Sequence, residues 1–218
     1  MPDSPPSAAP LLEAGALTPL QEDLVNILLN IGGPVFALLD ATRDPLRILG
    51  MLRSAGEEYQ SLYEGMSGKV LEAHAPFLVR LSGDSRLLET LVARGWGKHW
   101  GIFVVSAADF NTLRKHFRTF LMVKSPEGKQ LYFRYYDPRV LRVYLPTCNA
   151  AETNFVFGPV AAYLCEGETP DRLLVFQPGE DSPQYETVKL SGTFEENIDS
   201  PGGDVSQEVA FLKAALSE

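Results

Sequence analysis

Asp40, Trp96 and His99 are the residues with which this sequence comes closest to a catalytic site. Asp40 is followed four residues later by Asp44, and paired carboxylates can act as general acid and base. The run Gly95-Trp-Gly-Lys-His-Trp-Gly places Trp96 and His99 among glycines that permit close backbone approach. A structural role is favoured for both features. The two aspartates are expected to cap helices, and the tryptophans of the glycine-rich loop are expected to pack on the core. An enzyme would require Asp40, Trp96 and His99 to meet in one pocket.

Other signatures of catalysis are missing from the sequence. It contains no Gly-x-Ser-x-Gly elbow, no Gly-x-x-x-x-Gly-Lys-Ser/Thr loop and no Gly-x-Gly-x-x-Gly after an expected strand. His116 lies beside Arg114, Lys115 and Arg118, which favour its neutral form, but no partner nucleophile is evident. We therefore expect no catalytic residues, no cofactor and no metal ion. None of the usual zinc-binding spacings is found among the three histidines, His74, His99 and His116, and the two cysteines, Cys148 and Cys165. We expect both cysteine thiols to be free in a reducing compartment.

Residues 114–142 form a basic and aromatic stretch, called here the basic–aromatic segment. It holds eight basic and two acidic residues, a net charge of +6. Such a composition is typical of nucleic-acid surfaces and also of protein interfaces, where Arg and Tyr are common anchors. It is equally compatible with aromatic side chains in the core beneath solvated charges. The interleaved aromatic residues are Phe117, Phe120, Tyr132, Phe133, Tyr135, Tyr136 and, just beyond, Tyr144.

The formal net charge of −9 belongs wholly to the last quarter of the chain. Residues 1–165 hold equal numbers of basic and acidic residues, whereas residues 166–218 hold 3 basic and 12 acidic ones. An acidic region competes with nucleic acid for the same cations, which makes nonspecific nucleic-acid binding the less favoured alternative. We predict that the acidic region folds back over the basic surface or meets a basic partner.

Helical and strand patterns alternate along the chain and predict an α/β domain. We expect a mixed sheet with flanking helices and at least one antiparallel hairpin around Ser125-Pro-Glu-Gly. Thr18, Asp44, Ser106 and Asp137 are the expected N-caps, and Leu46, Leu49 and Leu52 are expected on a buried helix face. The expected helices are 19–31, 45–55, 86–95, 107–120, 138–145 and 149–157, and the expected strands are 35–39, 59–63, 77–81, 100–105, 121–123, 131–136, 160–165 and 173–176.

Three regions are expected along the chain. Residues 1–17 read as a mobile N-terminal arm, and residues 18–178 as the α/β domain. Residues 179–218 read as an acidic extension, with a Gly/Ser/Pro-rich linker over 179–203 and then a short helix. That helix carries one apolar stripe, formed by Val205, Val209, Leu212 and Leu216. No apolar run is long enough to span a membrane and no export signal is evident, so a cytoplasmic protein is expected.

An ordered set of motifs between residues 34 and 165 resembles the adaptor-chaperone domain of bacterial type VI secretion systems. Each motif alone is weak, but their order is specific. The motifs are Phe36-Ala-Leu-Leu-Asp-Ala-x-Arg-Asp-Pro, Ser61-Leu-Tyr-Glu-Gly, Ala75-Pro-Phe-Leu-Val-Arg-Leu, Gly95-Trp-Gly-x-x-Trp-Gly-Ile-Phe, Leu113-Arg-Lys-His-Phe-Arg, Phe133-Arg-Tyr-Tyr-Asp-Pro-Arg-Val-Leu, Leu145-Pro-Thr-Cys and Phe157-Gly-Pro.

The resemblance implies a cytoplasmic adaptor that is not an enzyme. Such proteins bind a toxic effector and load it onto the VgrG spike or a PAAR-containing tip, and the family offers no catalytic residues to transfer. On that basis we expect six residues to line or shape the partner surface. Asp137 is expected to cap the helix that begins at Pro138 and to pair with Arg139 or Arg134. The six residues are Arg118, Arg134, Tyr135, Tyr136, Asp137 and Arg139.

Overall fold

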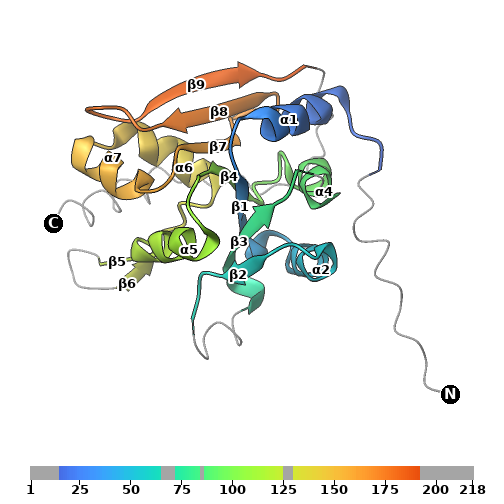
Figure 1. The fold of residues 1–218 in the computed structure, drawn as a ribbon, viewed down its shortest axis with the longest axis horizontal. Helices are drawn as coiled ribbons and strands as arrows, with labels where there is room; N and C mark the ends of the chain where they lie inside the picture. The colour runs from blue at the N-terminus through green and yellow to red at the C-terminus, as the bar shows by residue number, and fades with distance from the viewer. Residues whose placement is uncertain (1–14, 65–71, 84–85, 125–129, 192–218) are drawn as a thin grey trace.

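The structure is a computed structural model that describes residues 15–64, 72–83, 86–124 and 130–191 (Figure 1). Within these residues the chain forms six α-helices and nine β-strands, which confirms the α/β class with flanking helices. Seven strands form one sheet, and two more pair in a separate hairpin. The order in the sheet is β2 (Tyr59–Ser61), β3 (Pro76–Leu81), β1 (Val35–Asp40), β4 (Gly101–Val105), β7 (Ala162–Glu166), β8 (Arg172–Gln177) and β9 (Gln184–Lys189), and the hairpin consists of β5 (Met122–Lys124) and β6 (Gln130–Tyr132). The expected N-terminal arm up to residue 14 and the expected C-terminal helix lie outside the described residues.

Every strand pair among the described residues is antiparallel, whereas the sequence predicts a mixed sheet. The difference arises at β1, which lies between β3 and β4. Because β3 and β4 both run antiparallel to β1, they are parallel to each other. They are not paired, since β1 lies between them, and the helix that connects them in the chain joins two separated strands.

Helices cover both faces of the large sheet (Figure 1). One face carries α1 (Pro19–Asn30), α2 (Pro45–Ala55) and α4 (Arg86–Gly95). The other carries α5 (Phe110–Thr119), α6 (Pro138–Tyr144) and α7 (Ala150–Phe157). Because side chains alternate along a strand, β1 sends Val35, Ala37 and Leu39 to the first face and Phe36 and Leu38 to the second. A continuous apolar run is therefore what this strand requires.

Local capping chemistry sets most helix ends where the sequence predicts them. Thr18 caps α1 in a reciprocal capping box with Gln21. Asp44 and Asp137 cap α2 and α6, and each is followed by proline at the first helical position. Gly56 ends α2 with a φ of +71°, a conformation that glycine adopts without steric cost.

Four local predictions are wrong. The strand expected over 131–136 ends at Tyr132, and residues 133–136 lie outside any strand. Ser106 does not cap α5, because its hydroxyl donates to the carbonyl of Pro159 and Asp109 is the cap. Leu46 is 89% exposed, because Ile48, Leu49, Met51 and Leu52 form the buried side of α2. The linker expected over 179–203 contains β9, whose polar residues pair with β8 at the edge of the sheet. An edge strand with one solvated face lacks the apolar pattern that marks a buried one.

His116 on α5 makes the stability of this fold dependent on pH. Its ring packs against Phe117 and Phe120, and Nε2 donates to the carbonyl of Val156 at 2.9 Å. Burial lowers the pKa of His116 below its usual 6.5. The unfolded chain then binds a proton more readily than the folded one, so this contribution to stability is lost as pH falls through 6.5 towards the lower folded pKa.

We therefore expect the free energy of unfolding to fall between pH 7.5 and pH 5.5 by a larger amount in the native sequence than in His116→Gln. Urea unfolding at the two pH values measures both differences. Equal pH dependence in the two proteins would contradict the role of His116, because His74 and His99 are common to both.

Candidate partner-binding surface

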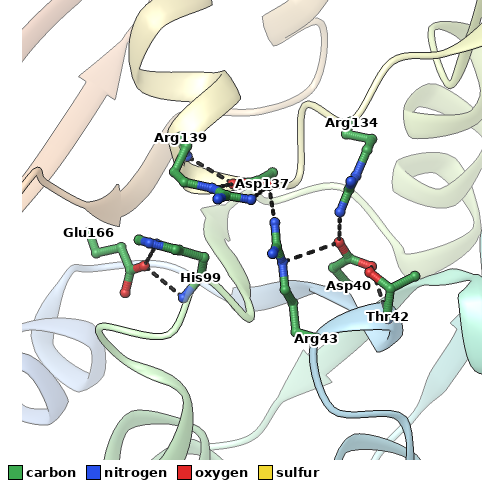
Figure 2. Close-up of polar contacts among 8 residues, drawn as sticks. All are labelled: Asp40, Thr42, Arg43, His99, Arg134, Asp137, Arg139 and Glu166. Atoms are coloured by element: carbon green, nitrogen blue, oxygen red, sulfur yellow. Dashed lines mark hydrogen bonds and ion pairs between the residues drawn. The ribbon is translucent and has the colours of Figure 1, made fainter. Parts of the chain in front are cut away.

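Asp137 anchors the start of α6 inside a buried cluster of charges (Figure 2). Its carboxylate accepts from the backbone N–H of Arg139 and from the Arg139 guanidinium, through Nε at 3.1 Å and Nη2 at 2.8 Å. Arg43, from the 3-10 turn after β1 (Ala41–Arg43), donates to the same carboxylate. Asp137 is 1% exposed, so the pairing takes place away from water. The predicted cap and the predicted pair with Arg139 are both confirmed.

Asp40 forms the second half of this cluster at the end of β1. Its carboxylate accepts from the backbone N–H and the hydroxyl of Thr42, at 3.0 and 2.6 Å, and so caps the short turn. Arg134 Nη2 lies 2.6 Å from Asp40 Oδ2, and Arg43 Nε lies 3.7 Å from the same oxygen. Figure 2 shows Arg43 between the two aspartates, joined to both. Two carboxylates and three guanidinium groups thus tie the segment 134–139 to the end of a central strand.

The charges of this cluster decide the protonation of Asp137. Burial alone would raise the pKa of Asp137, but the hydrogen bonds from Arg139 and the charges of Arg43 and Arg139 outweigh it. The pKa of Asp137 is therefore held below its usual value of 3.8, and the group stays ionised at neutral pH. Breaking such a buried pair by removing one partner is far more costly than replacing the whole pair.

Arg114 and Arg118 of α5 fix the chain that follows β2. Arg114 Nε donates to the carbonyl of Ser61 at 2.9 Å, and Arg118 Nε donates to that of Leu62 at 3.0 Å. Both guanidinium groups also pair with Glu64. These basic residues serve first as structural donors, because each donates to a backbone carbonyl of the chain itself.

Next to this contact, a part of the surface combines aromatic and basic groups. The Tyr63 and Tyr132 rings lie 5.3 Å apart, and Tyr132 is 47% exposed. Burial raises the pKa of Tyr63 to about 12, with smaller contributions from its neighbours Tyr132 and Asp40, so its hydroxyl stays neutral. The side chains of Arg118 and Arg134 are 30% and 36% exposed. We call this area the Tyr63–Tyr132 surface; its members are Tyr63, Glu64, Arg118, Tyr132 and Arg134.

The six residues predicted for the partner surface occupy different depths. Arg118 and Arg134 reach solvent and belong to the Tyr63–Tyr132 surface. Tyr135, Tyr136, Asp137 and Arg139 are buried, and the Tyr135 hydroxyl donates to the carbonyl of Phe117 at 2.7 Å. Because they are buried, these four residues do not line that surface. Their part in partner binding stays a prediction.

Burial of the aromatic residues also bears on the nucleic-acid alternative. Stacking of bases requires exposed aromatic faces. In and just beyond the basic–aromatic segment, Phe117, Phe120, Phe133, Tyr135, Tyr136 and Tyr144 are all buried in the core of the second face. Among the aromatic residues that suggested this alternative, Tyr132 alone is exposed. Beside it, Arg118 holds the carbonyl of Leu62 and the carboxylate of Glu64, and Arg134 pairs with Asp40.

Trp96, His99 and Asp40 have separate structural partners. Trp96 Nε1 donates to the carbonyl of Pro170 at 2.7 Å. Glu166, 2% exposed at the end of β7, accepts from the backbone N–H groups of Gly97 and His99 and contacts the His99 ring. Figure 2 shows this contact apart from the Asp40 cluster. Trp96 and Trp100 are buried in the core of the first face, as the simpler interpretation predicts, and Glu166 holds the loop between them.

Arg43, Tyr63 and Glu64 are the residues of this region that sequence reasoning missed. All three belong to motifs that carry the family resemblance, but neither motif shows which distant residue each one contacts. Arg43 reaches Asp137 across 94 positions, and Glu64 meets Arg118 across 54. For Arg43 the local signal is its position three residues after Asp40, the aspartate that ends a buried strand.

The described residues contain no group of three or more His, Cys, Asp or Glu side chains placed to hold a metal ion. Among the helices in this part of the chain, none has the length and apolar character needed to cross a membrane.

Both thiols are shielded in the folded chain. Cys148 and Cys165 are buried, and burial raises the pKa of Cys165 well above its ordinary value. We expect neither thiol to react with a water-soluble disulfide reagent under native conditions, because the thiolate is the reactive form and neither sulfur is accessible. Two thiols per chain should react in guanidinium chloride. Labelling of one thiol within minutes in the native protein would contradict this burial.

Comparison with known proteins identifies a family whose model covers this framework of caps and ion pairs. A family model described as "Domain of unknown function (DUF4123)" matches residues 35–154, from the start of β1 into α7. No curated protein and no solved structure gives a significant match to the chain. The matched family is associated with adaptors of type VI secretion effectors. The matched residues make up more than half of the 218 in the chain, which therefore belongs to the DUF4123 family.

Proposed function

We propose that this protein is a type VI secretion adaptor that binds a cognate toxic effector and loads it onto the VgrG or PAAR spike protein. The family match over residues 35–154 is the observation that carries the proposal. All five members of the Tyr63–Tyr132 surface lie inside the matched residues, which makes this surface the first candidate for effector contact. Loading takes place in the cytoplasm, before the effector is exported.

The composition of the Tyr63–Tyr132 surface supports protein binding. Tyr and Arg are the residues in which binding energy is most often concentrated. Arg118 is held by Leu62 and Glu64, and Arg134 is held by Asp40. Side chains that are already ordered lose little conformational entropy when a partner arrives. The buried cluster beneath therefore favours association although it never touches the partner.

The proposed activity is binding without catalysis. Supporting this, Asp40, His99 and Trp96 each serve the fold through their own hydrogen bonds, to Thr42 and Arg134, to Glu166 and to Pro170 respectively. An adaptor needs a stable surface and no reacting group. Effector and spike are therefore the partners proposed, with neither a membrane nor a nucleic acid required.

Capture of the effector encoded beside this protein tests the proposal directly. Tagged full-length protein should retain the effector at low salt, and spike protein should join the complex. We expect Tyr132→Ala and Arg118→Ala each to weaken effector affinity about tenfold, because each removes an exposed anchor from the surface. Leu46→Ala is the matched control, since Leu46 is 89% exposed on α2, in the opposite helical layer, and its loss should leave affinity unchanged.

Thermal unfolding of each variant separates lost binding from lost folding. Recovery of neither effector nor spike protein at low salt would refute the adaptor role. Equal loss of affinity in Leu46→Ala and Tyr132→Ala would refute the assigned surface alone. A gel shift with DNA or RNA that weakens steeply with salt would instead favour the nucleic-acid alternative.

A further inference from the structure

A groove of about 460 Å³ lies between α6 and the last two strands of the large sheet. Its apolar lining comes from Val143 and Pro146 on one side and from Leu174, Phe176 and Tyr185 on the other. Tyr185 is 57% and Val143 37% exposed, while Phe176 is fully buried and forms the floor. We call this the α6–β9 groove.

The strand register explains why these side chains share one face. Phe176 pairs with Tyr185, Leu174 with Thr187, and Arg172 with Lys189. Residues opposite each other in an antiparallel pair project to the same side. All six therefore face the helical layer of α5, α6 and α7, and Glu186 and Val188 face the other way.

Charge is distributed unevenly along the α6–β9 groove. Arg142 and Arg172 line one end, beside Lys189, with Glu168 and Asp171 as the nearest acidic neighbours. At the far end of this strand pair the β8–β9 loop carries Glu180 and Asp181. The strand pair thus runs from an end with three basic and two acidic groups to a loop with two acidic groups and no basic one. The groove suits an apolar segment that begins with acidic residues and has a basic residue further along.

The chain's own sequence after β9 has this character. Residues 192–218 lie outside the described residues and carry six acidic side chains and one lysine. The sequence predicts a short helix over 205–216 with an apolar stripe. Asp204 and Glu208 stand at its beginning and Lys213 follows. Its order of charges complements the groove from the basic end to the acidic end.

We infer that residues 205–216 of this chain dock as an amphipathic helix in the α6–β9 groove. A helix of twelve residues is about 18 Å long, and the six residues of β8 span about 20 Å. The described chain leaves at Ser191, directly after the strand that borders the groove. The twelve residues between Ser191 and Asp204 reach up to about 40 Å, enough to pass round the exposed edge of β9. This inference is independent of the proposed effector role.

Cysteine cross-linking in the full-length protein tests the docking. Thr187→Cys with Leu212→Cys places one thiol in the groove and one on the apolar stripe. Glu186→Cys with Leu212→Cys is the matched control, because Glu186 is also exposed on β9 but faces the other side of the sheet. The native Cys148 and Cys165 are buried and do not compete. We expect an intramolecular disulfide to form at least about tenfold faster in the first protein than in the control, because docking raises the effective concentration of the two thiols.

A charge variant gives a second and independent measurement. Arg172→Glu, added to the Thr187→Cys and Leu212→Cys pair, should slow the cross-link, as should raised salt. Equal rates in the pair and its Glu186 control would overturn the inference, as would a rate unchanged by both Arg172→Glu and salt. Disulfide-linked dimers whose yield rises with protein concentration would also overturn it, since the occupant would then be a second copy.

Discussion

Asp137→Ala should lower the free energy of unfolding by about 3–5 kcal/mol, the cost of leaving buried charges without their partner. The substitution removes the carboxylate that pairs with Arg139 and Arg43, together with the N-cap of α6. Urea unfolding measures the loss. Because the pKa of Asp137 is lowered, its contribution to stability is fully present above about pH 5 and is lost as pH falls through the folded pKa.

Asp44→Ala is the matched control for this change. Asp44 also caps a helix that begins with proline and also pairs with an arginine, Arg47, whose side chain is 59% exposed. Loss of a solvated cap costs about 1 kcal/mol. Asp137→Asn separates the two roles of Asp137, because asparagine caps well and carries no charge. Equal losses in Asp137→Ala and Asp44→Ala would show that the buried ion pairs add nothing.

Gly101→Ala should destabilise the protein by at least about 3 kcal/mol, through overpacking at a position where nothing can move aside. A Cβ at Gly101 would lie 2.0 Å from the carbonyl oxygen of Leu38 and 3.0 Å from the Cα of Leu39. Both atoms belong to the backbone of β1, which is paired on both sides. We expect a fall of about 6–12 °C in the melting temperature, or a failure to fold.

Gly83→Ala provides the comparison for that substitution. Gly83 follows β3, and a Cβ built there meets no atom within 4 Å. Its replacement should change stability by no more than about 0.5 kcal/mol, as is usual for an open surface position. A Gly101→Ala protein as stable as Gly83→Ala would contradict the close approach of β1 and β4.

The elements that sequence predicts correctly are those specified by neighbouring residues. Asp44 and Asp137 each cap a helix whose first residue is proline, so their signals are complete within a few positions. The run Val35 to Leu39 is apolar because helices cover both of its faces. By contrast, β9 is a polar strand at the edge of the sheet, and only its pairing with β8 identifies it as a strand. No local pattern separates such a strand from a linker.

The candidate surface was predicted only in part, for a similar reason. Arg118 and Arg134 were expected on it and reach solvent. Tyr135 and Tyr136 have the same residue types as good anchors but face the core. A basic and aromatic composition does not distinguish an exposed binding surface from a buried aromatic core with charged residues at its edge. That choice depends on how α5, α6 and the hairpin pack on the sheet, and hence on residues far away in the chain.

The central place of β1 also sets the order in which this chain can fold during synthesis. Its two neighbours, β3 and β4, are made 36 or more residues after its last residue. When β1 leaves the ribosome it has apolar side chains on both faces and no strand to pair with. Long-range antiparallel pairing of this kind is slow and leaves strand edges open. The nascent chain therefore stays vulnerable to aggregation until residue 105 has emerged and β4 completes the centre of the sheet.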